Sequence, residues 1–288
     1  MPNSIAHVTS YLTQILDEVY KQESTSAVLD LANNMVRPVG SSKGTVEIPS
    51  ITFDGGLVDY DKATGFDTGI VNLEWKPFVL TQDRGRRFNI DSVDNLESAG
   101  VALANVGSEF IRTFVVPEID AYRFAKYATS AGTKQSGALT KDDIEDALEV
   151  AITTLKDKEV PKGRLKLFMS SSSYSALKAS VKARRDVAGL SVVNGIAYYD
   201  DIPVYSVPSA RFNSAVSLSK GFTPSGSAIN FMLIDSASAV QVTRHVSEKL
   251  FTPEENQIAD GYLWRYRVYH DAFVPENKKN GIFVHTAS

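Results

Sequence analysis

A single apolar stripe runs through residues 94–116 and predicts a long amphipathic helix. Apolar residues recur there at steps of three and four, the period of one helix face: Leu96, Ala99, Leu103, Val106, Phe110 and Phe114. At 1.5 Å rise per residue such a helix is roughly 34 Å long, about the diameter of a small domain. We expect this spine helix to be broken at 116–118, where Pro117 lies, and to need a partner surface along its length. A chain built on one long spine favours an elongated structural building block over an enzyme pocket.

Composition restricts the class of protein further. The 288 residues are 43% hydrophobic, as in ordinary folded proteins, and include no cysteine, which excludes disulfides, thiolate metal sites and cysteine nucleophiles. No apolar run reaches the roughly 18 residues of a membrane span, and the first residues lack a signal-peptide pattern. We therefore expect synthesis in the cytoplasm and no membrane partner. A net charge of −4 argues against a protein whose main task is to bind nucleic acid phosphates.

Two segments before the helix carry apolar faces that need cover. Residues 3–36 predict an N-terminal helical arm, and residues 45–80 predict a long β-hairpin. In the return strand of the hairpin, apolar residues alternate with polar ones: Val71, Leu73 and Trp75 against Asn72, Glu74 and Lys76. Because an isolated two-stranded hairpin is marginal in water, a contact between subunits is an economical explanation for its apolar face. We expect the whole hairpin to be dispensable for folding and required for assembly.

Residues 140–235 predict a compact α/β domain. Its first helix opens with a capping-box-like sequence at 140–143 and turns four apolar residues inward, which are Ile144, Leu148, Ile152 and Leu155. A strand, a second helix, a tight hairpin and a buried strand follow at 164–170, 171–181, 195–207 and 229–235. The last part of the chain predicts three more strands, at 239–246, 261–274 and 280–286, and in the second of them an aromatic face alternates with a cationic one. We expect these three to pair with each other and with the spine helix, so that 140–235 is inserted into a split domain.

The sequence favours no catalytic, metal or cofactor site. It contains neither of the glycine-rich nucleotide-binding motifs, and the serine run 170–173 lacks the glycines of a nucleophile elbow, so we interpret Ser171 to Ser173 as helix-capping residues. The histidines are not at metal-ligand spacing: His7, His245, His270 and His285. The adjacent pair His270 and Asp271 point to opposite faces of a predicted strand, which favours a structural or solvent-exposed role. We predict that the protein is not an enzyme.

Two basic runs are more informative about binding surfaces. They contain Arg84, Arg86 and Arg87 in one case and Lys182, Arg184 and Arg185 in the other. These side chains are either part of a solvated surface or paired with acidic patches of a neighbouring subunit, since arginine suits bidentate contacts with carboxylates. The sequence leaves both interpretations open. The candidate subunit-interface residues are Trp75, Lys76, Arg84, Arg86, Arg87, Arg184 and Arg185.

The order of these parts resembles the major capsid protein of tailed bacteriophages, the Hong Kong 97-type fold. Local sequences are similar too: GTVEIPSITFDGGLVDYD and VLTQDRGRRFNID resemble the E-loop and its return, VVPEIDAYRFAKYA the far end of the spine helix, and GYLWRYRVYHDAFVPENKKNGIFVH the closing P-domain strands. The resemblance implies an α+β fold with an inserted α/β A-domain. Its implied segments are the N-terminal arm 1–42, the E-loop hairpin 43–88, the first P-domain part with the spine helix 89–139, the A-domain 140–235, and the second P-domain part 236–288.

The same resemblance implies a structural protein that self-assembles into the pentamers and hexamers of an icosahedral head around packaged double-stranded DNA. It implies location in the virion after assembly in the host cytoplasm. Implied partners are copies of the chain itself, a portal, DNA through weak non-specific contacts and, because only a short arm precedes the E-loop, a separate scaffolding protein or none. An encapsulin-like compartment shell around protein cargo resembles the same fold and is the alternative.

Overall fold

The computed structural model describes residues 24–30, 37–38, 44–60, 62–63, 65–92, 107–183, 190–193, 196–258 and 260–287. Several expectations fall outside these residues. They are most of the N-terminal arm, the first part of the spine helix, and the interface candidates Arg184 and Arg185.

The secondary-structure elements follow the sequence pattern closely. The helical elements are η1 Ser26–Leu29, the π-helical turn η3 Ile111–Val115, α4 Val116–Ser130, α5 Ile144–Asp157, η4 Lys162–Arg164, α6 Ser171–Ala183, η5 Ser209–Arg211 and η6 Glu276–Gly281. The strands are β1 Arg37–Pro38, β2 Thr45–Phe53, β3 Val71–Val79, β4 Gln82–Asp91, β5 Thr133–Ser136, β6 Leu165–Ser170, β7 Leu190–Val193, β8 Ile196–Tyr199, β9 Ile202–Val207, β10 Asn213–Ser219, β11 Gly221–Asp235, β12 Val240–Phe251, β13 Gly261–Phe273 and β14 Ile282–Thr286.

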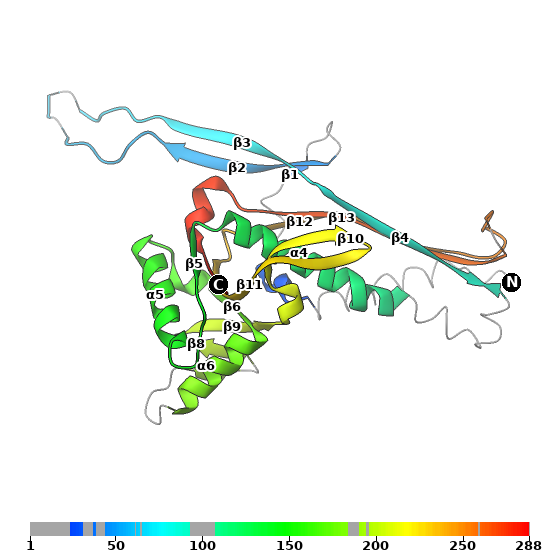
Figure 1. Cartoon of the computed structure of the whole chain (residues 1–288). Coiled ribbons are helices and arrows are strands. Elements are labelled where there is room, and N and C mark those ends of the chain that lie inside the picture. The colour runs from blue at the N-terminus through cyan, green and yellow to red at the C-terminus, as the bar shows by residue number, and fades with distance from the viewer. Residues whose placement is uncertain are drawn as a thin grey trace.

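These strands form three sheets. The largest has the order β5-β14-β11-β6-β9-β8-β7, with β10 paired to β11, and the two three-stranded sheets are β1-β2-β3 and β12-β13-β4. One apolar core packs α5 and α6 against one face of the large sheet, and a second core packs the end of α4 against other side chains of that sheet (Figure 1). The mixed α+β class is confirmed. Within 140–235 the structure adds β7 and β10 to the expected order of helix, strand, helix, hairpin and strand.

The last strand has different partners from those we expected. β14 pairs with β11 antiparallel and with β5 in parallel, within the large sheet, and not with β12 or β13. The reason lies in its burial, because Ile282, Phe283 and Val284 are all buried and so the strand is covered on both faces. Such a strand belongs inside a sheet that is covered on both sides.

The expected break of the spine helix at 116–118 is wrong. The chain is helical from residue 107 to Ser130, and the irregular part is the π-helical turn just before Pro117. The backbone N–H of Val116 donates to the carbonyl of Ile111, five residues back. Proline lacks an N–H and its ring crowds the carbonyl four residues earlier, so a locally widened turn accommodates Pro117 without ending the helix.

The three-stranded sheet β12-β13-β4 lies along this helix. β13 carries an apolar face towards the helix, where Trp264, Tyr266 and Val268 are buried against Ile111 and Val116, among others. The alternate residues of β13 point outward and include exposed arginines, as the alternation in the sequence indicates. From this sheet the β2-β3 hairpin projects away from the body of the molecule (Figure 1).

Candidate assembly surfaces

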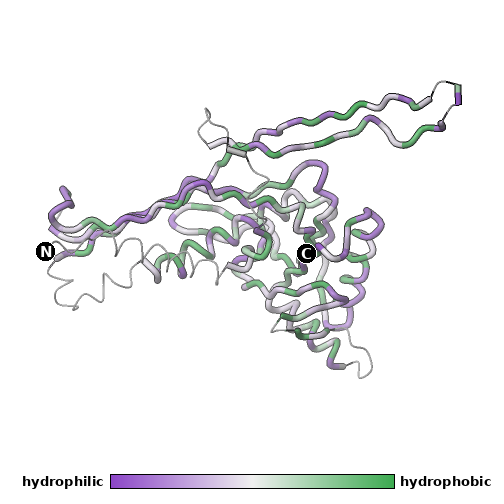
Figure 2. Tube along the Cα trace, turned by 180° about the vertical axis from the view of Figure 1, so that it is seen from behind, coloured by the Kyte–Doolittle hydropathy of each residue, from purple (hydrophilic) through white to green (hydrophobic). Residues whose placement is uncertain are grey.

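The projecting hairpin exposes a continuous apolar face. Directly opposed residues of β2 and β3 share a face, and three such pairs are apolar: Phe53 with Val71, Ile51 with Leu73, and Pro49 with Trp75. We call these six residues the hairpin ladder. Ile51, Phe53, Val71 and Leu73 are each more than half exposed. Figure 2 shows apolar positions interspersed with polar ones along both strands of the hairpin. Exposed apolar patches of this kind mark contact surfaces.

The root of the same hairpin buries its opposite face. Val46 lies across from Phe78, and both pack with Leu80 and Val242 in a small core of the subunit. Side chains at even and odd positions of a strand point to opposite faces. The face that carries Val46 is therefore buried at the root, and the other face, which carries Pro49, is the exposed apolar face further out. The root is thus held by its own subunit, while the hairpin ladder faces away from that core. Lys76 lies on the same face as the root residues, and Trp75 lies on the ladder.

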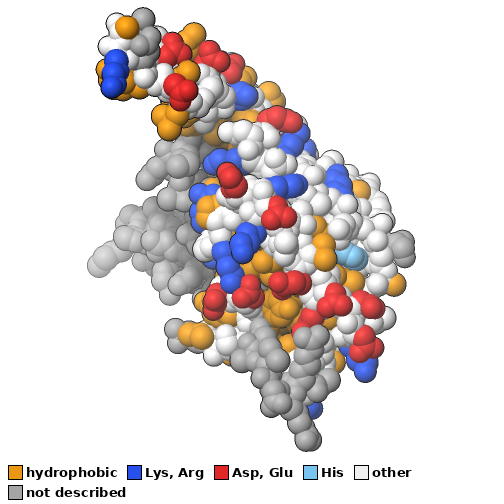
Figure 3. All heavy atoms as spheres, turned by 90° about the vertical axis from the view of Figure 1, so that its left-hand side faces the viewer, with side chains coloured by type: hydrophobic (Ala, Val, Ile, Leu, Met, Phe, Trp, Pro, Cys, Tyr) orange, Lys and Arg blue, Asp and Glu red, His pale blue; other side chains and the backbone are white. Residues whose placement is uncertain are grey.

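The tip of the hairpin combines exposed apolar groups with acidic ones. Leu57, Val58, Tyr60 and Phe66 are all more than half exposed, and the rings of Tyr60 and Phe66 lie 5.0 Å apart. Acidic and apolar side chains are seen together at this end of the molecule in Figure 3. The acidic residues of the tip are Asp54, Asp59, Asp61 and Asp67, against the one base Lys62. A neighbouring surface with cations and exposed rings would complement it.

A buried carboxylate fastens the junction where β3 gives way to β4. Asp271 accepts hydrogen bonds from the backbone N–H and the hydroxyl of Thr81, each at 2.8 Å, and from the Tyr122 hydroxyl, also at 2.8 Å. Burial is the main cause that raises the pKa of Tyr122, so its hydroxyl stays a donor. Asp271 therefore ties the hairpin root, the strand β13 and the spine helix α4 together.

A second buried carboxylate anchors the chain that leads in from the N-terminus. Asp120 is fully buried in α4 and accepts hydrogen bonds from the hydroxyls of Ser24 and Ser26, both at 2.7 Å, and of Thr25, at 3.0 Å. Arg211 approaches it at 3.5 Å. The sequence pattern did not predict this contact, although a lone aspartate within the apolar face of a helix is a signal for a buried polar anchor.

The basic run at the start of β4 divides between three environments. Arg84 makes a two-pronged contact with Glu118 of α4, at 2.7 and 3.2 Å, and donates to the Ser219 carbonyl at 2.7 Å. Arg86 is exposed on the same face, and its guanidinium lies 5.4 Å from the centre of the Phe88 ring. From the sequence we grouped the three arginines as one surface. In the structure, the contacts of Arg84 are with Glu118 and Ser219 of its own subunit.

Arg87 lies on the opposite face of β4 within a row of like charges. It is directly across from Arg265 of β13, which is directly across from Lys249 of β12. Like charges placed opposite one another across strands destabilise a sheet. Solvent or an acidic group of a neighbouring subunit would relieve this repulsion, so the interpretation of Arg87 as an interface residue stays a prediction.

The groups with possible catalytic character occupy structural positions. Ser170 caps α6, its hydroxyl accepting from the Ser173 N–H at 3.2 Å, so Ser171 to Ser173 form the first turn of the helix and the cap is the serine before them. His270 and Asp271 are both buried, so of the two roles expected for the pair, structural or solvent-exposed, the structure favours the structural one. Among the described residues, no group of three His, Asp or Glu is placed to hold a metal ion. In that same part of the chain, every helix is too short or too polar to span a membrane.

Stability should fall as the pH drops below neutral because of His270. Burial, helped by the positive charge of Arg123, lowers the pKa of this histidine from 6.5 to about 4. The unfolded chain therefore binds the proton between pH 6.5 and 4 while the folded chain does not, so folding stability should decrease by about 2 kcal/mol between pH 7 and pH 5. Urea denaturation of the wild type and of His270→Gln at both pH values checks this. Equal losses in the two proteins would contradict it.

Comparisons with known proteins place this fold among shell-forming capsid proteins. No protein-family model matches the chain, and no curated protein matches it significantly. Solved structures do match. The mature capsid of bacteriophage PhiM1 is 10% identical with a TM-score of 0.66, covering 86% of this chain and 83% of that one. The capsid of cyanophage P-SCSP1u is 13% identical with a TM-score of 0.62, covering 88% and 85%.

A further match comes from outside the phages. The virus-like particle from Pyrococcus furiosus is 11% identical with a TM-score of 0.53, covering 94% of this chain and 97% of that one. Identities this low carry the fold alone, but the coverage shows that the likeness extends over nearly all of each chain. The resemblance to a phage major capsid protein is therefore confirmed as a resemblance of fold: the chain has the α+β fold of phage capsid proteins.

Proposed function

We propose that this chain is the major capsid protein of a tailed phage, a structural protein whose copies assemble into the pentamers and hexamers of an icosahedral head around packaged double-stranded DNA. The observation that carries the proposal is the hairpin ladder, an exposed apolar face on an arm that projects from a chain with a capsid fold. A protein that worked as a monomer would leave that face in water. A shell covers it with a neighbouring subunit.

In this proposal the segments have separate tasks. Residues 1–42 are the N-terminal arm, 43–88 the E-loop with its return strand, 89–139 and 236–288 the two parts of the P-domain, and 140–235 the inserted A-domain. Trp75 and Lys76 on the hairpin, Arg86 and Arg87 on β4, and Arg184 and Arg185 serve the contacts between subunits. Arg84 acts indirectly, since it holds β4 against α4 within the subunit.

Assembly strength comes from repetition of weak contacts around a closed shell. Each subunit engages neighbours through several surfaces, so the second contact forms at the high effective concentration set by the first. We propose a portal and, where assembly requires it, a separate scaffolding protein as further partners. DNA is held by confinement and weak non-specific contact, because a chain of net charge −4 creates no strong attractive field for phosphates.

The purified chain should form particles, or oligomers of capsomer size, at high concentration. Light scattering follows the size of the assemblies, and negative-stain microscopy shows their shape. Assembly should be measured for the chain alone and, if the phage has a scaffolding protein, also in its presence. A protein that remains strictly monomeric under both conditions would contradict the proposed function.

A protein compartment that encloses protein cargo is the second candidate. The observation that favours this second function is the similarity to the virus-like particle from Pyrococcus furiosus, which extends over 97% of that chain. The material enclosed in the particles distinguishes the two functions. Particles purified from the native source should contain double-stranded DNA if the chain forms a phage head, and a single co-purifying enzyme or other protein if it forms a compartment.

A further inference from the structure

Residues 24–30, which we call the strap, lie where the large sheet, the spine helix α4 and the sheet β12-β13-β4 meet. The hydroxyl of Ser26 donates to Asp120 of α4 at 2.7 Å, and the Ser26 carbonyl accepts from the side chain of Gln241, in β12, at 3.1 Å. Leu29 is 1% exposed and belongs to the core between the end of α4 and the large sheet. The strap therefore contacts all three elements, although they lie far from it in the sequence.

The buried carboxylate of Asp120 has a second partner within reach. Arg211 lies in η5, which joins two strands of the large sheet, and its guanidinium is 3.5 Å from the carboxylate, longer than the roughly 2.7–2.9 Å of a strong charge-assisted hydrogen bond. The hydroxyls of the strap and the Thr25 N–H, at 2.9 Å, are the closer donors. Without the strap, the carboxylate would be buried with too few donors, and approach of Arg211 would compensate for that cost. Such an approach moves η5, and with it the large sheet, relative to α4.

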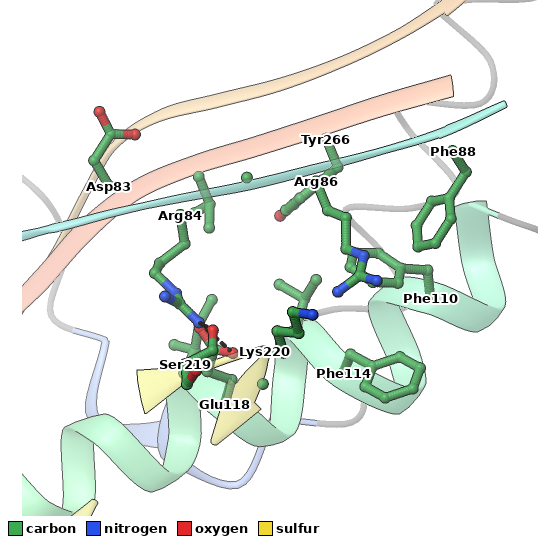
Figure 4. A pocket seen from close by; sticks show the side chains of 15 residues that line it. Asp83, Arg84, Arg86, Phe88, Phe110, Phe114, Glu118, Ser219, Lys220 and Tyr266 are labelled. Atoms are coloured by element: carbon green, nitrogen blue, oxygen red, sulfur yellow. Dashed lines mark hydrogen bonds and ion pairs between the residues drawn. The ribbon is translucent and has the colours of Figure 1, made fainter. Parts of the chain in front are cut away.

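The opposite side of α4 leaves room for this movement. Glu118 and Asp120 are two residues apart, so on a helix of 3.6 residues per turn they point to nearly opposite sides. Glu118 is held by Arg84 of β4, which also donates to the Ser219 carbonyl at the tip of the β10-β11 hairpin (Figure 4). Beside this contact lies a hollow of about 710 Å³, lined by β4, the spine helix and the hairpin tip at 219–221. The hairpin tip can shift into that space without displacing packed side chains.

We infer that the strap is a conformational switch of the subunit. When it is bound to Asp120, it fixes the large sheet and the helices α5 and α6 on the spine helix. When it is withdrawn, Arg211 closes on Asp120 and the large sheet takes a second position on the helix. The inference rests on the proposed function only for the use of the switch: residues 1–23 precede the strap, so a partner in the shell that binds them better with the strap withdrawn shifts the subunit to that second position.

Truncation of the buried strap residue tests the switch in the full-length protein. Leu29→Ala should speed hydrogen exchange at 24–30 roughly thirtyfold or more, since it removes the apolar contact that holds the strap. Val28→Ala is the matched control, because Val28 is 39% exposed, and it should exchange as the wild type. Adding Arg211→Gln to Leu29→Ala should slow the exchange again, because the withdrawn state loses the group that closes on Asp120. Exchange that stays as fast, or becomes faster, would mean that Arg211 only supports the bound strap and would overturn the inference.

Spin labels measure the movement of the large sheet directly, because the chain contains no cysteine of its own. Thr113→Cys on the spine helix and Lys178→Cys on α6 are exposed label sites. Labelled subunits diluted with unlabelled ones should give one distance in the wild type and a second population in the Leu29→Ala background. Lys156→Cys, on α5, paired with Lys178→Cys is the control, since both helices pack on the large sheet, and its distance should be the same in both proteins.

An unchanged distance between Thr113 and Lys178, despite a fast-exchanging strap, would overturn the inference and leave the proposed function intact, because neither measurement depends on particle formation. A second population in a chain that never forms particles would support the switch and contradict the proposed function. If Leu29→Ala does not fold, Ser24→Ala takes its place, since it removes a single hydroxyl that donates to Asp120 at 2.7 Å, and the same two readouts decide.

Discussion

Replacing residues 49–75 with a short Gly-Ser linker should give a folded subunit that no longer forms particles. These residues comprise the hairpin ladder and the tip, and the ladder side chains Ile51, Phe53, Val71 and Leu73 are mostly exposed in the single subunit. Their loss therefore removes little buried apolar area, while it removes the face that we propose neighbours cover. Thermal melting should stay cooperative with an unchanged midpoint, and negative-stain microscopy should show no shells.

Removing the whole hairpin, residues 45–80, should give a different result. That deletion also takes Val46 and Leu80, which are 2% and 4% exposed, out of the core that they share with Val242. Loss of a buried aliphatic side chain costs about 2–5 kcal/mol, so this variant should be markedly less stable. The sequence-based expectation that all of 45–80 is dispensable for folding is thus restricted to the part beyond the root.

A point variant separates loss of the ladder from loss of chain length. Ile51→Ser with Leu73→Ser, two residues that lie directly opposite each other, should fold as the wild type and assemble poorly. If the 49–75 replacement loses its cooperative melt, the outer hairpin is part of the core and our account of the fold is wrong. If it still forms normal shells, the hairpin is not the assembly element.

Asp120→Ala should destabilise the folded subunit strongly. Its carboxylate is fully buried and accepts hydrogen bonds from Ser24, Thr25 and Ser26, and alanine deprives all three of this acceptor. Removing one member of such a buried group costs about 3–5 kcal/mol. We expect the chemical denaturation midpoint to fall accordingly, and hydrogen exchange at residues 24–29 to accelerate, because the segment loses its anchor on α4.

Two controls bracket that substitution. Asp120→Asn retains the shape and one oxygen acceptor, so its loss of stability should be smaller than that of alanine. Asp142→Ala removes a carboxylate whose side chain is 78% exposed and should change stability by less than about 0.5 kcal/mol. An Asp120→Ala protein as stable as the wild type, with unchanged exchange at 24–29, would show that the buried network does not hold the N-terminal segment.

The sequence by itself determined the elements whose pattern is local. The period of 3.6 placed α5 correctly, because Ile144, Leu148 and Leu155 recur on one helix face and all three are buried. The period of two placed β13 and its division into an apolar and a cationic face. The order of these elements, together with local sequences that resemble those of capsid proteins, also indicated the capsid fold, which the solved structures confirm. The candidate interface residues, by contrast, were selected by residue type alone, and their role stays a prediction.

Tertiary structure alone decided which surface covers each apolar face and which polar groups meet. Ser24 and Asp120 are 96 residues apart, and Thr81 and Asp271 are 190 apart. Periodicity says which side of an element is apolar but not what packs on it, since that depends on the summed contacts of distant segments. The same limit explains why β14 joined the large sheet. It also explains why neighbouring arginines of β4 have different tasks: Arg84 meets an acid of its own subunit on α4, and Arg86 faces a hollow that its subunit does not fill.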